Sequence, residues 1–252
     1  MKRFYRQYIE IMGIKIYIFL AASVILSFVT GAMQRGINGR IGENCLKDFL
    51  IYYNYRIAPI MLLTVVTFAI AVYLNKMYES GRIVRYVDIQ SFYLKVILGM
   101  CAHMLIIVAA VGVIIVTGGA ASCGFIIDNW QNEDSYALIM FGEKLVNTPA
   151  YTIIAAELAS YFIIGIINGM IIMIIRRFTG NMFVGYFASV IVSYLFLSEP
   201  NVNFGGINAF YIKEGIYQNG WSISSLIFPT VLIAILLFII MIMGKRDLIK
   251  KR

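Results

Sequence analysis

Three polar residues lie inside apolar stretches of the sequence, where they could bind or relay an ion. They are Glu157, His103 and Asn168. An ionisable side chain inside a membrane helix commonly marks an ion or proton path. Histidine and asparagine at such depths more often bond a neighbouring helix, and a glutamate can do the same or reach the membrane surface. We therefore treat these residues as candidates for an intramembrane polar site, with structural bonding as the alternative for each.

Recognisable catalytic patterns are absent from the sequence. It has no GxxxxGK(S/T) phosphate loop, no HExxH pair, no GxSxG turn and a single histidine. A chain without the phosphate loop has no recognisable means of its own to use ATP. We therefore expect that the chain is not an enzyme and that it binds no metal or cofactor itself.

The three cysteines, Cys45, Cys101 and Cys123, have no metal-ligand spacing such as a CxxC pair. Cys45 and Cys123 both fall in segments that we place outside the membrane, where disulfides form and persist. Sequence alone does not give their separation, so a disulfide and two thiols both fit the pattern.

The composition is typical of a membrane protein. Of the 252 residues, 61% are hydrophobic and 13% are charged, and the mean hydropathy is +0.83. Soluble domains carry roughly a quarter charged residues. We predict an all-α polytopic membrane protein. Its net charge of +8 is better explained by orientation in the bilayer than by binding of nucleic acid.

Six apolar runs approach or exceed the roughly 18 residues that indicate a spanning helix. They are 14–33, 57–74, 96–117, 152–175, 181–197 and 223–244. Wound as a helix, residues 1–13 separate apolar from polar positions, which predicts a helix in the membrane interface, with a merely basic flank as the alternative. No repeat or long linker divides the chain, so residues 1–252 form a single predicted membrane domain.

The loop 75–95 fixes the predicted orientation, because it contains more basic than acidic residues. These are Lys76, Arg82, Arg85 and Lys95 against Glu79 and Asp88. Cytoplasmic loops of membrane proteins carry an excess of Lys and Arg. Placing this loop inside puts 15 of the 21 Lys and Arg residues on the inner side. Both termini are then cytoplasmic.

Three segments are predicted to face outwards. The first, 34–56, is polar and, against the trend, carries four basic residues. The second, 118–151, is acidic, and its part 135–146 could form a short helix capped by Asp134 or Ser135. The third, 198–222, mixes aromatic residues with Gly and Asn, as in a re-entrant segment that enters the outer interface and returns.

Small residues at helical spacing predict close packing of helices. Gly165 and Gly169 form a GxxxG pair, and Gly185, Ser189 and Ser193 recur every four residues. Such residues let two helix backbones approach. Packing within the chain and packing against a second copy or a paralogous subunit both fit the pattern.

Two short motifs lie at the cytoplasmic side of the predicted spans. Glu79, Ser80, Gly81 and Arg82 form an acidic residue followed by a turn, with Lys95 near the start of the third span. The sequence Lys-Arg-Asp-Leu at 245–248 follows the last span. Together with the interfacial helix, the six spans and the re-entrant segment, these motifs resemble the permease subunit of type 2 ABC exporters. Family members usually have Thr in the place of Arg82.

The resemblance implies a mechanism and partners. The loop would contain a coupling helix that docks on a separate cytosolic ATPase, which would bind ATP and Mg²⁺. The coupling residues would be Glu79, Gly81, Arg82, Arg85 and Asp88. Two permease subunits, identical or paralogous, would enclose a path through the plasma membrane of a bacterium. The exported substrate would be an antimicrobial peptide, a drug or a lipid.

Two other functions fit the same sequence. A non-transporting accessory or sensor subunit would share this architecture. An ion-coupled carrier would give Glu157 a direct role in transport. A neighbouring gene for an ATPase would favour the exporter over both.

Overall fold

The computed structural model describes residues 45–50, 58–78, 89–123, 148–197 and 223–249, with the single positions 13, 18, 21, 22, 25, 26, 125, 126, 135 and 138. The regular structure within them is helical, which confirms the all-α class. Almost all of the predicted interfacial helix 1–13 and first span 14–33 lies outside these residues. The loop residues 79–88 and the segment 198–222 lie outside them entirely.

Five long helices match the second to sixth predicted spans in order. They are α4 (Ala58–Met77), α6 (Ile89–Ser122), α8 (Ala150–Thr179), α9 (Met182–Leu197) and α11 (Ile223–Ile249). Most extend beyond the apolar runs, because the residues next to those runs are not helix breakers. The connection between α4 and α6 is therefore shorter than the predicted loop 75–95. At ~1.5 Å per residue, α6 is about 51 Å long.

Two helical segments, Gln90–Ala121 and Ala150–Thr179, are long and apolar enough to cross a membrane. Among the described residues, three apolar segments are shorter: Thr64–Met77, Met182–Ser193 and Pro229–Met243. By length and composition, two of the six predicted spans are therefore able to cross a membrane, and the other four remain predictions.

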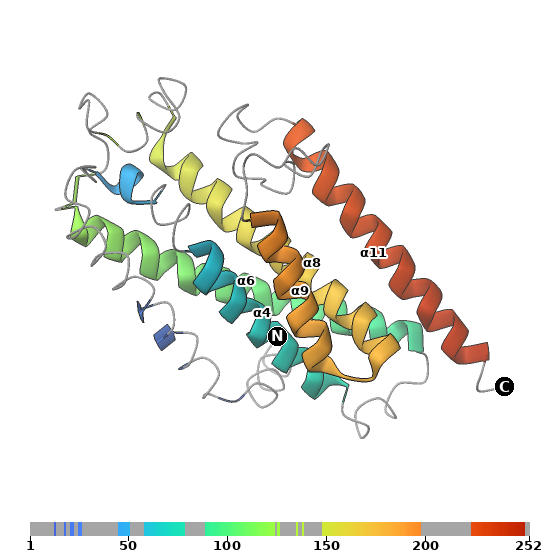
Figure 1. The fold of residues 1–252 in the computed structure, drawn as a ribbon. Helices are drawn as coiled ribbons and strands as arrows, with labels where there is room; N and C mark the ends of the chain where they lie inside the picture. The colour runs from blue at the N-terminus through green and yellow to red at the C-terminus, as the bar shows by residue number, and fades with distance from the viewer. Residues whose placement is uncertain are drawn as a thin grey trace.

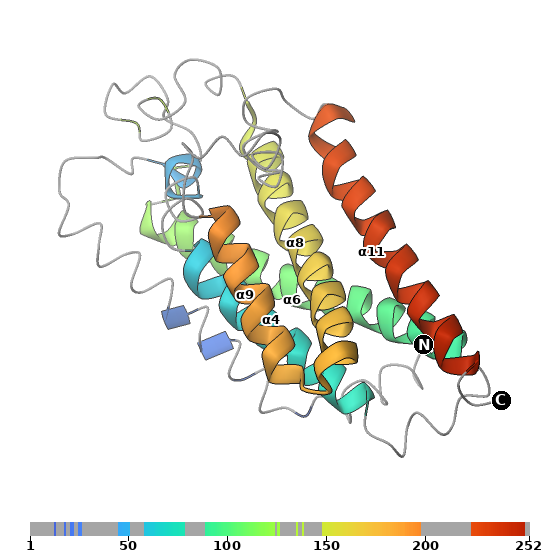
Figure 2. The same cartoon turned by 45° about the vertical axis from the view of Figure 1, so that its right-hand side comes forward.

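Helix α8 occupies the middle of the bundle. It packs against α4, α6, α9 and α11, so each of the other long helices in the described part of the chain contacts it. Figures 1 and 2 show α8 between α9 on one side and α11 on the other. A displacement of α8 would therefore disturb all four interfaces.

A tight turn makes α8 and α9 antiparallel neighbours, as their short connection predicts. Gly180 ends α8 with a φ of 73°, a left-handed conformation that costs glycine little. Its amide donates a hydrogen bond of 2.7 Å to the Arg176 carbonyl. Asn181 Oδ1 then accepts a bond of 2.8 Å from the Phe183 amide and begins α9.

The two ends of the bundle differ. One end, which we call the basic end, gathers the last turns of α4, α8 and α11 and the first turns of α6 and α9 (Figures 1 and 2). Lys76, Arg176 and Arg177 lie in those last turns, and Lys95 lies near the start of α6. The opposite end carries a short helix, residues 46–50, beside the last turn of α6.

The outside of the bundle is apolar, while polar side chains lie in its interior. Phe183, Phe187 and Ile191 recur every four residues along α9 and are 57% to 64% exposed. Large apolar side chains on α6 and α11 are also exposed: Leu94, Leu98, Leu105, Val113, Ile227, Val231, Ile235 and Phe238. The buried polar residues of the helices include Thr67, His103, Glu157, Ser160, Asn168, Ser189 and Ser193. Helices of soluble proteins instead present polar residues on their exposed face.

Candidate functional site

A network of hydrogen bonds joins three helices inside the bundle. The side-chain amide of Asn168, on α8, donates to Thr67 Oγ1, on α4, at 2.9 Å. Ser193 Oγ, on α9, donates to Asn168 Oδ1 at 2.8 Å. All three residues are buried, with at most 5% of their surface exposed. The network satisfies polar groups that would be costly to bury alone, and it fixes α8 between α4 and α9.

Glu157 lies on the same face of α8 as Asn168 but well away from it. Its side chain is 3% exposed. The Ser160 hydroxyl donates to the Glu157 main-chain carbonyl at 2.7 Å. Since 11 residues separate Glu157 from Asn168, the two lie about 16 Å apart along the helix axis at ~1.5 Å per residue. The carboxylate and the amide therefore belong to different parts of the interior.

His103 is fully buried on α6 and stacks on Tyr73 of α4, with ring centroids 5.5 Å apart and an interplanar angle of 22°. The register of α6 against α8 follows from two contacts: Met104 packs on Gly165, and Leu158 packs on Gly112. His103 is therefore level with Gly165, two turns of α8 from Glu157. The three polar residues singled out in the sequence do not form one site.

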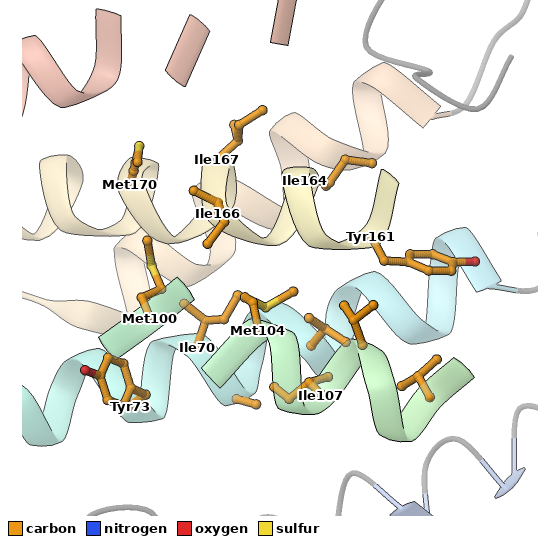
Figure 3. Close-up of a cluster of buried hydrophobic side chains, with 14 of the residues drawn as sticks. Ile70, Tyr73, Met100, Met104, Ile107, Tyr161, Ile164, Ile166, Ile167 and Met170 are labelled. Carbon is orange, nitrogen blue, oxygen red and sulfur yellow. The ribbon is translucent and has the colours of Figure 1, made fainter. Parts of the chain in front are cut away.

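Methionines fill the space over the GxxxG pair of α8. Met104 packs on Gly165, while Met100 and Ile70 pack on Gly169. Figure 3 shows these three side chains projecting from α6 and α4 towards α8. The GxxxG pair thus serves packing within this chain.

The small residues of α9 also face the chain's own interior. A Cβ added at Gly185 would lie 3.0 Å from the main-chain oxygen of Ile172, so the backbones of α8 and α9 come close together here. Ser189 is fully buried, and its hydroxyl donates to the Tyr186 carbonyl at 2.8 Å. Ser193 belongs to the polar network. These three small residues therefore contribute to the contacts that α9 makes within the bundle.

At the basic end, four residues from three segments form what we call the aromatic–arginine cluster: Arg176, Tyr78, Phe92 and Tyr93. Tyr78 is the residue directly after α4. The guanidinium carbon of Arg176, on α8, lies 3.9 Å from the centre of the Tyr78 ring. The Tyr78 ring meets Phe92 and Tyr93 of α6 edge-on, with centroids 5.2 and 6.3 Å away. Helix α8 thus contacts Tyr78, which directly precedes the segment 79–88. Through the Tyr78 ring it is also linked to Phe92 and Tyr93, which follow that segment.

The Tyr78 hydroxyl is buried within the cluster. Burial raises the pKa of the Tyr78 phenol and the nearby Tyr93 raises it further, while Arg176 and Arg177 lower it. The net upward shift keeps the phenol neutral at physiological pH. The contact between Arg176 and the ring is therefore a cation–π interaction, not an ion pair.

At the opposite end, a buried carboxylate joins the short helix 46–50 to a distant segment. Asp48 Oδ1 accepts a hydrogen bond of 2.6 Å from Ser135 Oγ, and Asp48 Oδ2 accepts one of 3.4 Å from Cys45 Sγ. Lys47 and Asp48 are both 0% exposed. A carboxylate buried this completely requires such donors.

The sequence analysis assigned residues 34–56 to a polar outer loop and did not predict this burial. The residues of 34–56 that the structure describes pack against the end of α6 instead, because Leu46 and Phe49 supply an apolar face within the loop. Ser135 also accepts a bond of 3.4 Å from the Leu138 amide, the geometry of a helix cap. Most of the predicted short helix 135–146 lies outside the described residues.

Sequence reasoning singled out Asn168 and Ser193 of the polar network but missed Thr67. It also missed Asp48 and the aromatic–arginine cluster. A usable signal for the cluster was present, since aromatic residues lie near both ends of the basic loop 75–95 and Arg176 is basic. The coupling residues inferred from the family resemblance, Glu79, Gly81, Arg82, Arg85 and Asp88, lie outside the described residues.

No group of three or more His, Cys, Asp or Glu residues within the described ranges is arranged to hold a metal ion. Comparison with known proteins gives no match, whether against family models, curated proteins or solved structures.

Proposed function

We propose that this chain is the permease subunit of a type 2 ABC exporter, driven by a separate cytosolic ATPase. The observation that carries the proposal is the aromatic–arginine cluster. It links both sides of the segment 79–88 to α8, and α8 packs against each of the other long helices described. A force applied to that segment would therefore reach the whole bundle. The motif that resembles the family lies in the same segment.

The distribution of polar and apolar side chains supports insertion in a bilayer. Side chains such as Phe187 and Leu105, each 60% exposed, would face lipid without penalty, whereas apolar surface of this extent in water promotes association. The interhelical bonds of Asn168 hold helices together where lipid provides no hydrophobic drive for their association. The two helices of sufficient length and hydropathy are consistent with this proposal.

The basic end would be cytoplasmic. Lys76, Arg176 and Arg177 lie in the final turns there, and cytoplasmic ends of spans are enriched in such residues. In the proposed topology the chain crosses the membrane six times with both termini inside. The first span 14–33 and the re-entrant segment 198–222 complete that arrangement.

Energy would enter by contact, because the sequence contains no phosphate loop. An ATPase that binds two conformations of the segment 79–88 with different affinity would shift the bundle between them. Two permease subunits would enclose the path, and the substrate would be an antimicrobial peptide, a drug or a lipid.

The test is purification of the full chain from its native membrane in mild detergent. We expect an ATPase with a phosphate loop to co-purify and its hydrolysis to be stimulated by the chain. Substitution of Arg82, Arg85 and Asp88 should reduce that stimulation without reducing membrane insertion. Consistent absence of an ATPase would overturn the proposal, and unchanged stimulation would remove the segment from the mechanism.

A second function, an ion-coupled carrier, is favoured by the burial of Glu157. Its side chain is 3% exposed within a helix long enough to span a membrane. In an ATP-driven exporter Glu157→Gln should change transport little. In a carrier the same substitution should cause a pH-dependent loss of transport. Transport assays in vesicles with and without ATP distinguish the two.

A further inference from the structure

Two cysteines lie at the corner where the short helix 46–50 meets the end of α6. The Leu46 amide donates to the Ile126 carbonyl at 2.8 Å, and the Ile126 amide donates to the Cys123 carbonyl at 3.3 Å. Cys45 directly precedes Leu46. Through Ile126, the backbones next to the two cysteines are thus connected by consecutive hydrogen bonds.

A second set of contacts packs the short helix against the end of α6. Phe49 lies one turn after Cys45 and packs on Gly119, which lies one turn before Cys123. Leu46 packs on the same Gly119, so the first turn of the short helix lies across the last turn of α6. These contacts hold Cys45 and Cys123 in the same corner of the fold.

The backbone after α6 is constrained to make this corner. Phe125 has a φ of 62°, which is unusual for a bulky residue. Its amide donates to the Ala120 carbonyl at 2.7 Å, and the reversal brings Ile126 back over the short helix. Cys45 and Cys123 are 0% and 7% exposed and carry thiols in this structure.

The third cysteine cannot join either of them. Cys101 lies 22 residues before Cys123 along α6, which is about 33 Å at ~1.5 Å per residue. A disulfide requires Cα atoms within roughly 7 Å of each other. Of the three pairings that the cysteines allow, only Cys45 with Cys123 is compatible with the fold.

We propose that Cys45 and Cys123 form a disulfide that joins the short helix to the outer end of α6. The inference goes beyond the proposed function and uses only its topology, in which this end faces the oxidising side of the membrane. The bond would form by exchange with a disulfide of a thiol oxidant. The two thiols lose two protons and two electrons, and the oxidant's disulfide is reduced to two thiols. Asp48 loses the hydrogen bond from Cys45 and keeps that from Ser135.

The test counts thiols in the full chain taken directly from membranes. The protein is denatured in acid, labelled with a maleimide of high mass before or after reduction, and separated on a gel. The wild-type chain should accept one label before reduction and three after it, since it has three cysteines. The variant Cys101→Ala should accept none before reduction and two after it. Two labels on unreduced Cys101→Ala would overturn the proposal.

Two further measurements guard against a failure to fold. Mass spectrometry of the unreduced wild-type protein should yield a peptide pair linked through Cys45 and Cys123, without any substitution. Cys45→Ser should free Cys123, so that the unreduced variant accepts two labels. Failure to find the linked peptides would contradict the disulfide proposal but not the exporter proposal. The exporter proposal is tested separately, by co-purification of the ATPase.

Discussion

The polar network inside the bundle and the aromatic–arginine cluster at its basic end join the same central helix by different physical means. In the network, Asn168 makes two directional hydrogen bonds, of 2.9 and 2.8 Å, to small side chains. In the cluster, Arg176 lies over a broad ring that meets other rings edge-on. Hydrogen bonds weaken steeply when the donor angle falls below about 120°, whereas aromatic pairs are favourable over centroid distances of about 4.5–7 Å and in more than one orientation. The network therefore suits a fixed part of α8, and the cluster suits a part that moves.

The largest expected effect is that of Asn168→Leu, which keeps a similar volume and removes both hydrogen bonds. We expect the free energy of unfolding to fall by about 1 to 3 kcal/mol, because each interhelical bond contributes roughly 0.6 to 1.7 kcal/mol in membranes. Unfolding in detergent followed by circular dichroism measures this loss.

The single substitutions Thr67→Val and Ser193→Ala are the controls for Asn168→Leu, since each removes one of the two hydrogen bonds of Asn168. Each should cost less than Asn168→Leu, and a double-mutant cycle should show coupling of Asn168 with both. Absence of coupling would mean that the network does not fix α8.

An intermediate effect is expected at the glycines that flank the network. Gly165→Ala should be nearly neutral, because the end of the Met104 side chain can move and alanine gains about 1 kcal/mol in helix propensity. Gly185→Ala should be net destabilising by about 1 kcal/mol, since the atoms it meets include the backbone of Ile172. The difference in midpoint denaturant concentration between the variants measures this contrast. Equal effects would show that the backbones of α8 and α9 can separate freely.

At the basic end, the expected loss of stability is smaller than that of Gly185→Ala. Arg176→Gln removes a cation–π contact worth about 0.5 to 1 kcal/mol. Arg177→Gln, at the exposed neighbouring position, should change stability less and serves as the matched control. In the proposed exporter, Arg176→Gln should lower transport per ATP hydrolysed while Arg177→Gln should not. A large loss of stability with normal coupling would reverse the roles that we assign to the two regions.

The five described helices could be predicted because apolar runs of sufficient length have few alternatives to a helix. The ends of these helices could not be predicted, because residues such as Gln90 and Lys95 are compatible both with a helix and with a loop. Asn168 was conspicuous as an amide among isoleucines, whereas Thr67 is common in membrane helices and gave no signal.

The two ends of the bundle were the hardest parts to predict. The contact between Tyr78 and Arg176 joins residues far apart in sequence and depends on the register of separate helices. Lys47 and Asp48 are charged residues in a polar loop, for which exposure is the ordinary expectation. Their burial follows from the packing of Leu46 and Phe49 on Gly119, a contact that no local pattern encodes.

Because α6 is so long, its position and tilt would depend on the thickness of the membrane. A helix of about 51 Å would have to tilt by more than 50° to fit within the ~30 Å of a hydrocarbon core, well beyond the usual range of 0–40°. Part of α6 must therefore project into the headgroups or the water in the proposed topology. A thicker bilayer would draw more of it into the lipid and alter its tilt. The distance between the aromatic–arginine cluster and the membrane surface would then depend on the lipids around it.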